Sequence, residues 1–198
     1  MPIENTSIEG LLAVRWQPIE DKRGFFKQSY QESELAAALG RPPRLAQGNH
    51  SRSHAGVLRG FHTEPWDKFV YVPRGTVMFV AADARPDSPT FGRTESFLLG
   101  DAPGEFARIF VSRGLSNAFY CHTETDYLND TSAEFDPANR HGIAWNDPTL
   151  AVDWPTQSPI LSDTDAGLPM LSDLFPDHPV IRAAAMRAGP APATSRRR

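Results

Sequence analysis

The stretch GVLRGFHTEPWDKF, residues 56–69, places three side chains that could act on a substrate within ten residues. These are Arg59, His62 and Lys68, and their neighbours are largely apolar. An imidazole can act as a base near neutral pH, an ammonium can stabilise a developing negative charge, and a guanidinium can bind phosphate. Burying such groups without partners costs on the order of several kcal/mol. Either each side chain has its own partner or reaches the solvent, or all three share a pocket.

Each of these residues also has a purely structural interpretation. His62 could be a core histidine whose hydrogen bonds are satisfied. Arg59 could pair with Asp67 or Glu64, and Lys68 could be a solvated residue at the start of a strand. We interpret the other histidines as structural; they are His50, His54, His122, His141 and His178.

Five short strands are predicted between Lys68 and His122, because these segments are rich in Val, Phe, Tyr and Ile and are bounded by Pro, Gly, Asp or Ser. The link VPRGTV, with Pro73 and Gly75, predicts that the first two strands form a hairpin. Short strands about ten residues apart without intervening helices indicate an antiparallel sandwich or barrel. We therefore expect an all-β jelly roll. The strands are 68–72, 76–83, 94–99, 107–111 and 117–122.

A short helix is predicted in SYQESELAAALG, residues 29–40. Ser29 and Glu32 have the spacing of a capping box, and Gly40 is a typical stop. Past Phe135 the regular periodicity is lost, which predicts loops and short turns that wrap the barrel.

The chain is expected to form one domain over residues 1–178. Residues 179–198 are expected to form a final helix, which we place at 178–189 in HPVIRAAAMRAG, and a flexible basic tail. The tail contains AGPAPATS and ends in Arg196, Arg197 and Arg198. Its Pro, Ala and Ser cannot form a packed core.

Composition excludes several classes of function. A net charge of −4 gives no general attraction to nucleic acid. No apolar stretch reaches the roughly 18 residues that span a bilayer, and the first ten residues lack the layout of a signal peptide. The single cysteine, Cys121, cannot form an internal disulfide. We therefore expect a cytoplasmic protein with a buried, inert thiol.

Five blocks of sequence, in order within residues 9–171, resemble the nucleotide-sugar epimerase family typified by dTDP-4-dehydrorhamnose 3,5-epimerase. They are EDKRGFFKQSY, QGNHSRSHAGVLRGFH, RPDSPTFGR, HGIAWNDPTLAVDWP and PILSDTDAGLPML. The resemblance implies a cupin-type jelly roll and a homodimer in which each subunit lends residues to the other. It implies no metal and no other cofactor, and substrates that are dTDP-linked 4-keto-6-deoxy sugars.

The resemblance also implies roles for the residues of the opening stretch. His62 matches the base that removes a proton alpha to the ketone, and Asp165 matches the carboxylate that holds its tautomer. Lys68 matches the lysine that faces the keto oxygen, where a cation stabilises an enolate. Asp165 and its neighbour Asp163 could instead be turn residues.

By the same matching, Arg59 contacts the diphosphate, for which a planar guanidinium fork suits better than lysine. Gln47 and Asn49 bind nucleotide or sugar. Arg23 reaches into the neighbouring subunit's site, although it could instead be an exposed cation in a turn.

A mononuclear metal site is not expected. A metal-binding cupin needs two histidines one residue apart and a third on a later strand, so that the imidazoles converge on one ion. His62 is followed by Glu64 two residues on, and Asn117 stands where the later ligand would be. Asn117 also resembles a subgroup of the epimerase family, so we expect it at the substrate.

In the family, inversion uses a second group that returns a proton from the opposite face, a tyrosine in a strand like DYLY. Asn129 in DYLN stands at that position here. Asparagine cannot donate a proton in that way. Water or another side chain could donate instead, and Tyr127 and Asp130 are nearest in sequence, although we expect both to point away from the side of Asn129. Alternatively, the protein inverts a single carbon or moves the keto group, or it binds sugar nucleotide without turnover.

The leading hypothesis is epimerisation of a dTDP-4-keto-6-deoxyhexose at C3 and/or C5, at one centre rather than two, in deoxysugar biosynthesis. The competitors are a 3,4-ketoisomerase, a non-catalytic sugar-nucleotide binding protein and, more distantly, a metal-dependent oxygenase. Further differences predict an altered pocket: Ile19 stands where an aromatic often stacks on thymine, Gln28 replaces a usual glutamate, and the loop from His62 to Lys68 is short.

Overall fold

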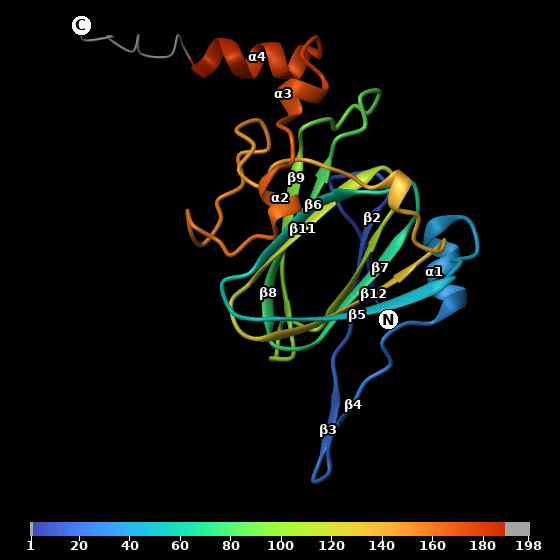
Figure 1. Ribbon diagram of the computed structural model, residues 1–198. Coiled ribbons are helices and arrows are strands. Elements are labelled where there is room, and N and C mark those ends of the chain that lie inside the picture. Colours follow the sequence, from blue (N-terminus) through green and yellow to red (C-terminus); the bar gives the residue numbers. More distant parts are fainter. Residues whose placement is uncertain (1, 189–198) are drawn as a thin grey trace, which may run out of the picture.

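Two antiparallel β-sheets face each other in the computed structural model, which describes residues 2–188 (Figure 1). The larger sheet has the order β1 (Ile3–Asn5), β2 (Leu11–Arg15), β10 (Ala107–Val111), β7 (Lys68–Arg74), β12 (Thr125–Thr131) and β5 (Gln47–Ser53). The smaller sheet has the order β13 (His141–Gly142), β6 (Leu58–Thr63), β11 (Leu115–Cys121), β8 (Thr76–Asp83) and β9 (Thr94–Gly100). This arrangement confirms the all-β jelly roll.

The five strands predicted between Lys68 and His122 are confirmed, but the predicted hairpin is wrong. β7 pairs with β10 and β12, whereas β8 pairs with β11 and β9 in the opposite sheet. The link at Gly75 therefore carries the chain from one sheet to the other. The reason lies in packing: Val70 of β7 and Val77 and Phe79 of β8 meet in the core between the sheets instead of lying side by side.

Buried apolar side chains form three layers, one between the two sheets and one on the outer face of each sheet. One lies between the sheets and includes Phe79, Leu99 and Ile109. A second covers the outer face of the five-stranded sheet, where the C-terminal segment packs. The third covers the outer face of the six-stranded sheet, where Leu35 of a short helix is fully buried. Both sheets are therefore covered on both faces, and this explains why their sequences show short apolar runs as well as alternation.

The short helix α1 spans Glu32–Leu39 and ends, as predicted, at Gly40, whose φ of 67° is left-handed. The predicted capping box is wrong, because Gln31 is the residue at the N-cap and its side chain makes no capping hydrogen bond. Before the helix, Gln31 has an extended backbone, and the Tyr30 ring lies edge-on against the Phe69 ring, with centroids 5.3 Å apart. The helix begins at Glu32, so Ser29 lies three residues before it and cannot cap it.

The segment after Phe135 consists of loops and short turns, as predicted. Besides the two-residue strand β13, its elements are η1 (Pro137–Asn139), α2 (Asp163–Ala166), α3 (Leu171–Leu174) and α4 (Pro179–Ala188). The final helix is confirmed over its described residues, and the predicted basic tail lies outside them. No helix within residues 2–188 is both long and apolar enough to cross a membrane.

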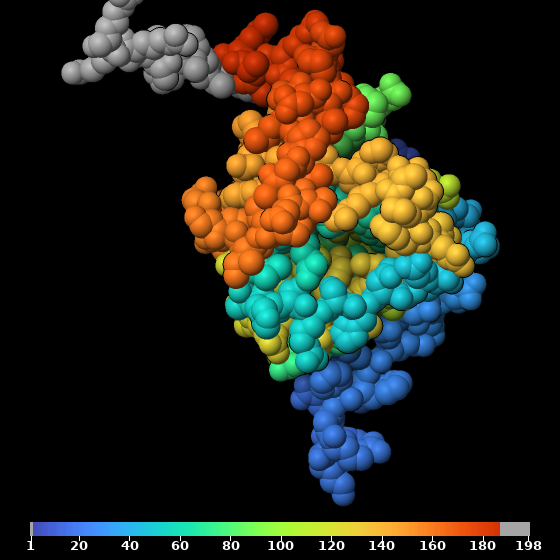
Figure 2. Space-filling view, in the orientation of Figure 1, coloured from blue at the N-terminus to red at the C-terminus, as the bar shows by residue number. Residues whose placement is uncertain are grey.

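A separate two-stranded ribbon, β3 (Ile19–Asp21) and β4 (Gly24–Phe26), projects from the barrel (Figures 1 and 2). At its base, the Lys27 ammonium lies 4.2 Å from the centroid of the Phe106 ring and 5.4 Å from that of Trp16. Cation–π contacts of this kind hold the ribbon to the barrel.

Candidate active site

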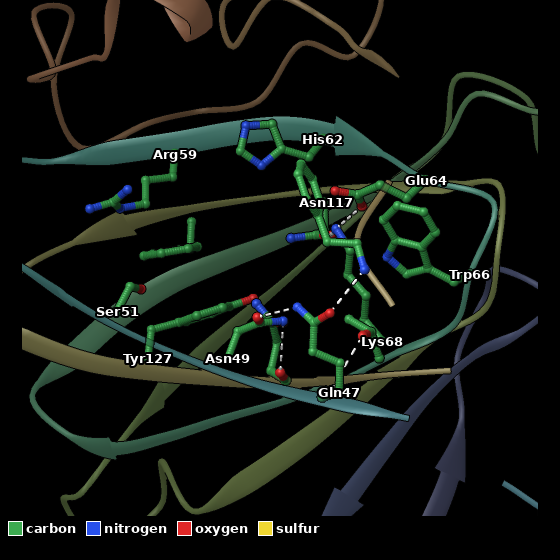
Figure 3. A pocket seen from close by; sticks show the side chains of 14 residues that line it. Gln47, Asn49, Ser51, Arg59, His62, Glu64, Trp66, Lys68, Asn117 and Tyr127 are labelled. Atoms are coloured by element: carbon green, nitrogen blue, oxygen red, sulfur yellow. Dashed lines mark hydrogen bonds and ion pairs between the residues drawn. The ribbon is translucent and has the colours of Figure 1, made fainter. Parts of the chain in front are cut away.

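A cavity of about 240 Å³ opens between the two sheets (Figure 3). One wall comes from β5, β12 and β7 of the six-stranded sheet, and the facing wall comes from β6 and β11. Seven of the predicted site residues line it: Gln47, Asn49, Arg59, His62, Lys68, Asn117 and Asn129. The structure therefore brings together residues that are as far as 82 positions apart in sequence.

Strand alternation explains the first wall and reveals residues that the sequence analysis missed. Tyr127, Asn129 and Thr131 lie directly opposite Ser51, Asn49 and Gln47, and all six side chains line the cavity. Residues two apart in a strand share a face. The residues two positions from Asn49 and from Asn129 could therefore have been predicted from the sequence to line the same cavity. Other missed lining residues are Glu64, Trp66, Phe119 and Phe135.

The facing wall depends on an irregularity in β6. Arg59 and His62 are three residues apart, so plain alternation would place them on opposite faces. The pairing of β6 with β11 shifts register between Asn117 and Phe119, and the backbone at Gly60 has a φ of 111°. This β-bulge turns both Arg59 and His62 toward the cavity, while Phe61 is fully buried in the outer core.

Replacing Gly60 with alanine is expected to destabilise the protein and distort the site. A Cβ there would lie 2.5 Å from the Asn117 carbonyl oxygen, at a φ that side chains rarely adopt. We expect a loss of about 1–3 kcal/mol in the free energy of unfolding, measured by urea denaturation. Gly104→Ala is the matched control, because its φ is 91° and no atom lies within 4 Å. An equal loss in both variants would show that backbone strain alone, and not this close approach, is responsible.

His62 and Asp165, which are 103 residues apart in sequence, form a hydrogen bond of 2.8 Å between Nε2 and Oδ1. Asp165 is buried in α2, whose first turn is capped by the Ser162 hydroxyl, and its other oxygen accepts a 3.4 Å hydrogen bond from the Gly60 N–H. Burial raises the pKa of Asp165, but the hydrogen bond and charge interaction with His62 outweigh it and leave the pKa below its ordinary value. The carboxylate is therefore ionised at neutral pH.

An ionised carboxylate only accepts hydrogen bonds, so His62 carries a proton on Nε2, and its neutral form has the lone pair on Nδ1. In Figure 3 the other ring nitrogen lies on the cavity side. The His62 side chain is 24% exposed, so the ring is reachable from the cavity. This arrangement can accept a proton from a bound molecule. The interpretation of His62 as a core histidine is wrong, because its ring lines the cavity and is partly exposed.

Lys68 is buried on β7 rather than solvated, which corrects the structural interpretation of this residue. Its ammonium forms an ion pair with Glu64 and donates a 2.8 Å hydrogen bond to Asn117 Oδ1 (Figure 3). Burial lowers the pKa of Lys68, and the Glu64 carboxylate opposes that shift. The site therefore holds a partly desolvated cation beside a fixed anion.

Arg59 does not pair with Asp67 or Glu64, the two acids nearest in sequence. Its Nε donates a 3.0 Å hydrogen bond to Ser53 Oγ, and the side chain lines one end of the cavity. Asp67 instead accepts a 2.7 Å hydrogen bond from Arg41 and one of 3.0 Å from the backbone N–H of Arg113. The bulge in β6 is the reason, because it turns Arg59 away from this loop.

A chain of amides crosses the floor of the cavity (Figure 3). Gln47 Nε2 donates to Asn49 Oδ1 at 2.6 Å, and Asn49 Nδ2 donates to Asn129 Oδ1 at 2.9 Å. The Phe135 N–H donates to Gln47 Oε1 at 2.9 Å. Asn129 is thus held as part of a polar surface that can bind hydroxyls or carbonyls, and it supplies no acidic proton.

The expectation that Tyr127 and Asp130 both point away from Asn129 is wrong for Tyr127. Tyr127 lies two residues before Asn129, so the two share the cavity face of β12. Asp130 does point to the opposite face, where it accepts a 2.5 Å hydrogen bond from Arg108.

Arg23 lies far from the cavity of its own chain, on the projecting ribbon. Its side chain is 82% exposed, and its guanidinium pairs with Asp21 at 2.5 Å. Ile19, on the same ribbon, is 73% exposed. Neither residue lines the cavity of the described chain.

Cys121 and His50 lie outside the cavity. Cys121 is buried as predicted, and burial raises the pKa of its thiol. His50 contacts Asp126 at 3.0 Å on the surface. Within residues 2–188, no three His, Cys, Asp or Glu side chains are grouped in a way that could hold a metal ion.

Comparison with known proteins shows the family to which this chain is similar. The family model described as dTDP-4-dehydrorhamnose 3,5-epimerase matches residues 5–173. A dTDP-4-dehydrorhamnose 3-epimerase from Streptomyces niveus is 36% identical over 178 residues, which cover 87% of this chain and 85% of that protein.

Solved structures agree with the family match. NovW, a 4-keto-6-deoxy sugar epimerase from the novobiocin biosynthetic gene cluster of Streptomyces spheroides, superposes with a TM-score of 0.85 at 35% identity, covering 89% of this chain and 90% of that one. RmlC from Legionella pneumophila, in complex with dTDP-4-keto-L-rhamnose, gives a TM-score of 0.80 at 34% identity, covering 86% and 93%. The jelly roll is thus of the cupin-like type, and the chain belongs to the dTDP-4-dehydrorhamnose 3,5-epimerase family.

Proposed function

We propose that this protein epimerises a dTDP-4-keto-6-deoxyhexose by removing and returning a proton alpha to the ketone, in deoxysugar biosynthesis. The observation that carries the proposal is the 2.8 Å hydrogen bond between His62 and Asp165 in a cavity that also holds Lys68. A base with a fixed tautomer, beside a buried cation, suits the removal of a weakly acidic C–H.

His62 Nδ1 takes the proton from the carbon next to the ketone, and the electron pair moves onto the keto oxygen. Asp165 stabilises the imidazolium that forms, because its carboxylate faces the Nε2–H of the same ring. Lys68 stabilises the enolate oxygen from the other sheet. Return of a proton to the opposite face of the carbon completes the inversion.

The nucleotide and sugar occupy the rest of the cavity. Arg59 binds the diphosphate at one end, since its guanidinium can present a planar pair of donors to phosphate oxygens. Gln47, Asn49, Asn117 and Asn129 supply amide contacts to nucleotide or sugar. A structural relative crystallised with dTDP-4-keto-L-rhamnose supports this class of substrate.

Inversion at one carbon only is part of the proposal. Asn129 occupies the position of the tyrosine in the family's strand, so the second proton source is altered. A curated relative that is 36% identical carries the name 3-epimerase. Both observations favour a single centre, and product analysis identifies which one.

A homodimer is also proposed, with Arg23 of each subunit lent to the other subunit's cavity. The ribbon of β3 and β4 exposes 73% of Ile19 and 70% of Phe26 beyond the barrel (Figure 2). Apolar side chains in such a projecting ribbon are typical of an interface. Sedimentation velocity should give the mass of two chains, and a monomer at assay concentration would contradict the dimer. A cytoplasmic location remains the expectation from the single cysteine.

The deciding experiment is proton NMR of a dTDP-4-keto-6-deoxyhexose incubated with the protein in heavy water. Deuterium incorporation at C3 or C5, with an inverted product, is expected. A product with a moved carbonyl would indicate a 3,4-ketoisomerase. Tight dTDP binding by calorimetry without exchange at any carbon would indicate a non-catalytic binding protein.

A further inference from the structure

Tyr127 carries a buried hydroxyl that nothing in the described chain satisfies. The residue is 3% exposed, and its ring stacks on Phe119 with centroids 3.9 Å apart and planes 9° apart. Among residues 2–188, no hydrogen-bond partner reaches Tyr127 Oη, although this atom is buried. Figure 3 shows the hydroxyl end of the ring directed into the cavity. A buried phenol usually finds a partner, so one that points into an open cavity suggests that a bound molecule supplies it.

Three polar groups on the strands of this wall are already engaged. Asn129 accepts a hydrogen bond from Asn49, and Asp130 faces away toward Arg108. Lys68 is paired with Glu64. None of these is free to give a proton to carbon in the way that a phenol can.

Tyr127 also lies on the side of the cavity that inversion requires. His62 projects from β6 in the five-stranded sheet, and Tyr127 projects from β12 in the six-stranded sheet. A sugar held between the sheets therefore has the imidazole on one face and the phenol on the other. Burial raises the pKa of Tyr127 well above its ordinary value, and the Glu64 charge adds to this shift, so the hydroxyl keeps its proton at neutral pH.

We propose that Tyr127 is the catalytic acid of this protein and protonates the enolate carbon on the face opposite His62. The new C–H bond forms as the phenol O–H bond breaks, and the electron pair returns from the enolate to restore the ketone. Tyr127 then regains a proton from water while the His62 imidazolium releases one. The phenol thus does from position 127 what Asn129 cannot do from position 129. This assignment rests on the proposed function.

The test separates proton removal from inversion. Tyr127→Phe keeps the ring stacked on Phe119 and removes only the hydroxyl. In heavy water we expect the variant to exchange the substrate C–H with retention, since His62 can return deuterium to its own face. Formation of the inverted product should fall about a hundredfold or more. The control is Tyr120→Phe, which changes a half-buried tyrosine outside the cavity. This variant should form the inverted product at the wild-type rate.

A rescue variant distinguishes a catalytic role of the phenol from a purely structural one, because only a catalytic role predicts that inversion recovers. Asn129→Tyr in the Tyr127→Phe background restores a phenol to the same face of β12, and inversion should recover. Inversion at the wild-type rate in Tyr127→Phe would overturn the assignment. So would loss of both exchange and inversion in a variant that still binds dTDP. Wild-type protein with no exchange at any carbon would instead overturn the proposed function, and this assignment with it.

Discussion

Replacing His62 with alanine is expected to lower deuterium incorporation into the 4-keto sugar by about a hundred to ten thousand fold, the usual worth of a general base. No other described residue in the cavity combines a lone pair on a ring nitrogen with a buried carboxylate behind it. The measurement is the initial rate of C–H exchange by proton NMR, with dTDP binding followed by calorimetry.

Binding should survive this change, because Arg59 and the amide chain are held by other contacts. The fold should be retained at some cost in stability, because the buried Asp165 carboxylate loses its imidazole partner and keeps only the hydrogen bond from the Gly60 N–H. His54→Ala is the matched control, because that imidazole is 85% exposed and lies outside the cavity. If His62→Ala still exchanges the C–H at the wild-type rate, His62 is not the base.

Asp165→Asn tests the same pair from the other side. An amide oxygen can still accept from His62 Nε2, but it removes the negative charge that stabilises the imidazolium. We expect a partial loss of exchange, smaller than that of His62→Ala. An equal loss in the two variants would mean that the carboxylate does more than orient and stabilise the ring.

The barrel was predictable because its strands are apolar, short and well separated. The segments 76–83 and 107–111 match β8 and β10 residue for residue. Sheet membership was not predictable from a tight link such as the one at Gly75. A two-residue turn and a crossing between sheets use the same residue types, and only the packing of the inward faces decides between them.

The site was predictable as a set of residues but not as a geometry. The family resemblance supplied His62, Lys68 and Asp165 together; His62 and Lys68 line the cavity, and Asp165 hydrogen-bonds to His62. The bulge at Gly60, however, turns Arg59 away from Asp67 and toward the cavity, and a sequence gives little sign of one extra residue in a strand. The ion pair of Glu64 with Lys68 was also missed, because Glu64 was considered as a partner of Arg59 and not of Lys68.

Lys68→Met is expected to affect both stability and catalysis, because Lys68 holds a buried ion pair and faces the proposed enolate. Loss of the ammonium leaves the Glu64 carboxylate, whose side chain is 11% exposed, without its counter-charge. Removing one partner of a buried pair typically costs about 3–5 kcal/mol in the free energy of unfolding. The rate of exchange should fall about a hundred to a thousand fold, the range for losing one stabilising group at an oxyanion.

The double variant Lys68→Met/Glu64→Gln separates these two effects. With both charges removed, no unpaired ion remains buried, so most of the unfolding free energy should return in urea denaturation. The rate should not return, because an amide and a thioether cannot replace a cation at the enolate oxygen. Recovery of both properties would show that Lys68 serves the fold alone. Recovery of stability without rate would place the ammonium in the reaction, beside an enolate that the same pocket forms with His62.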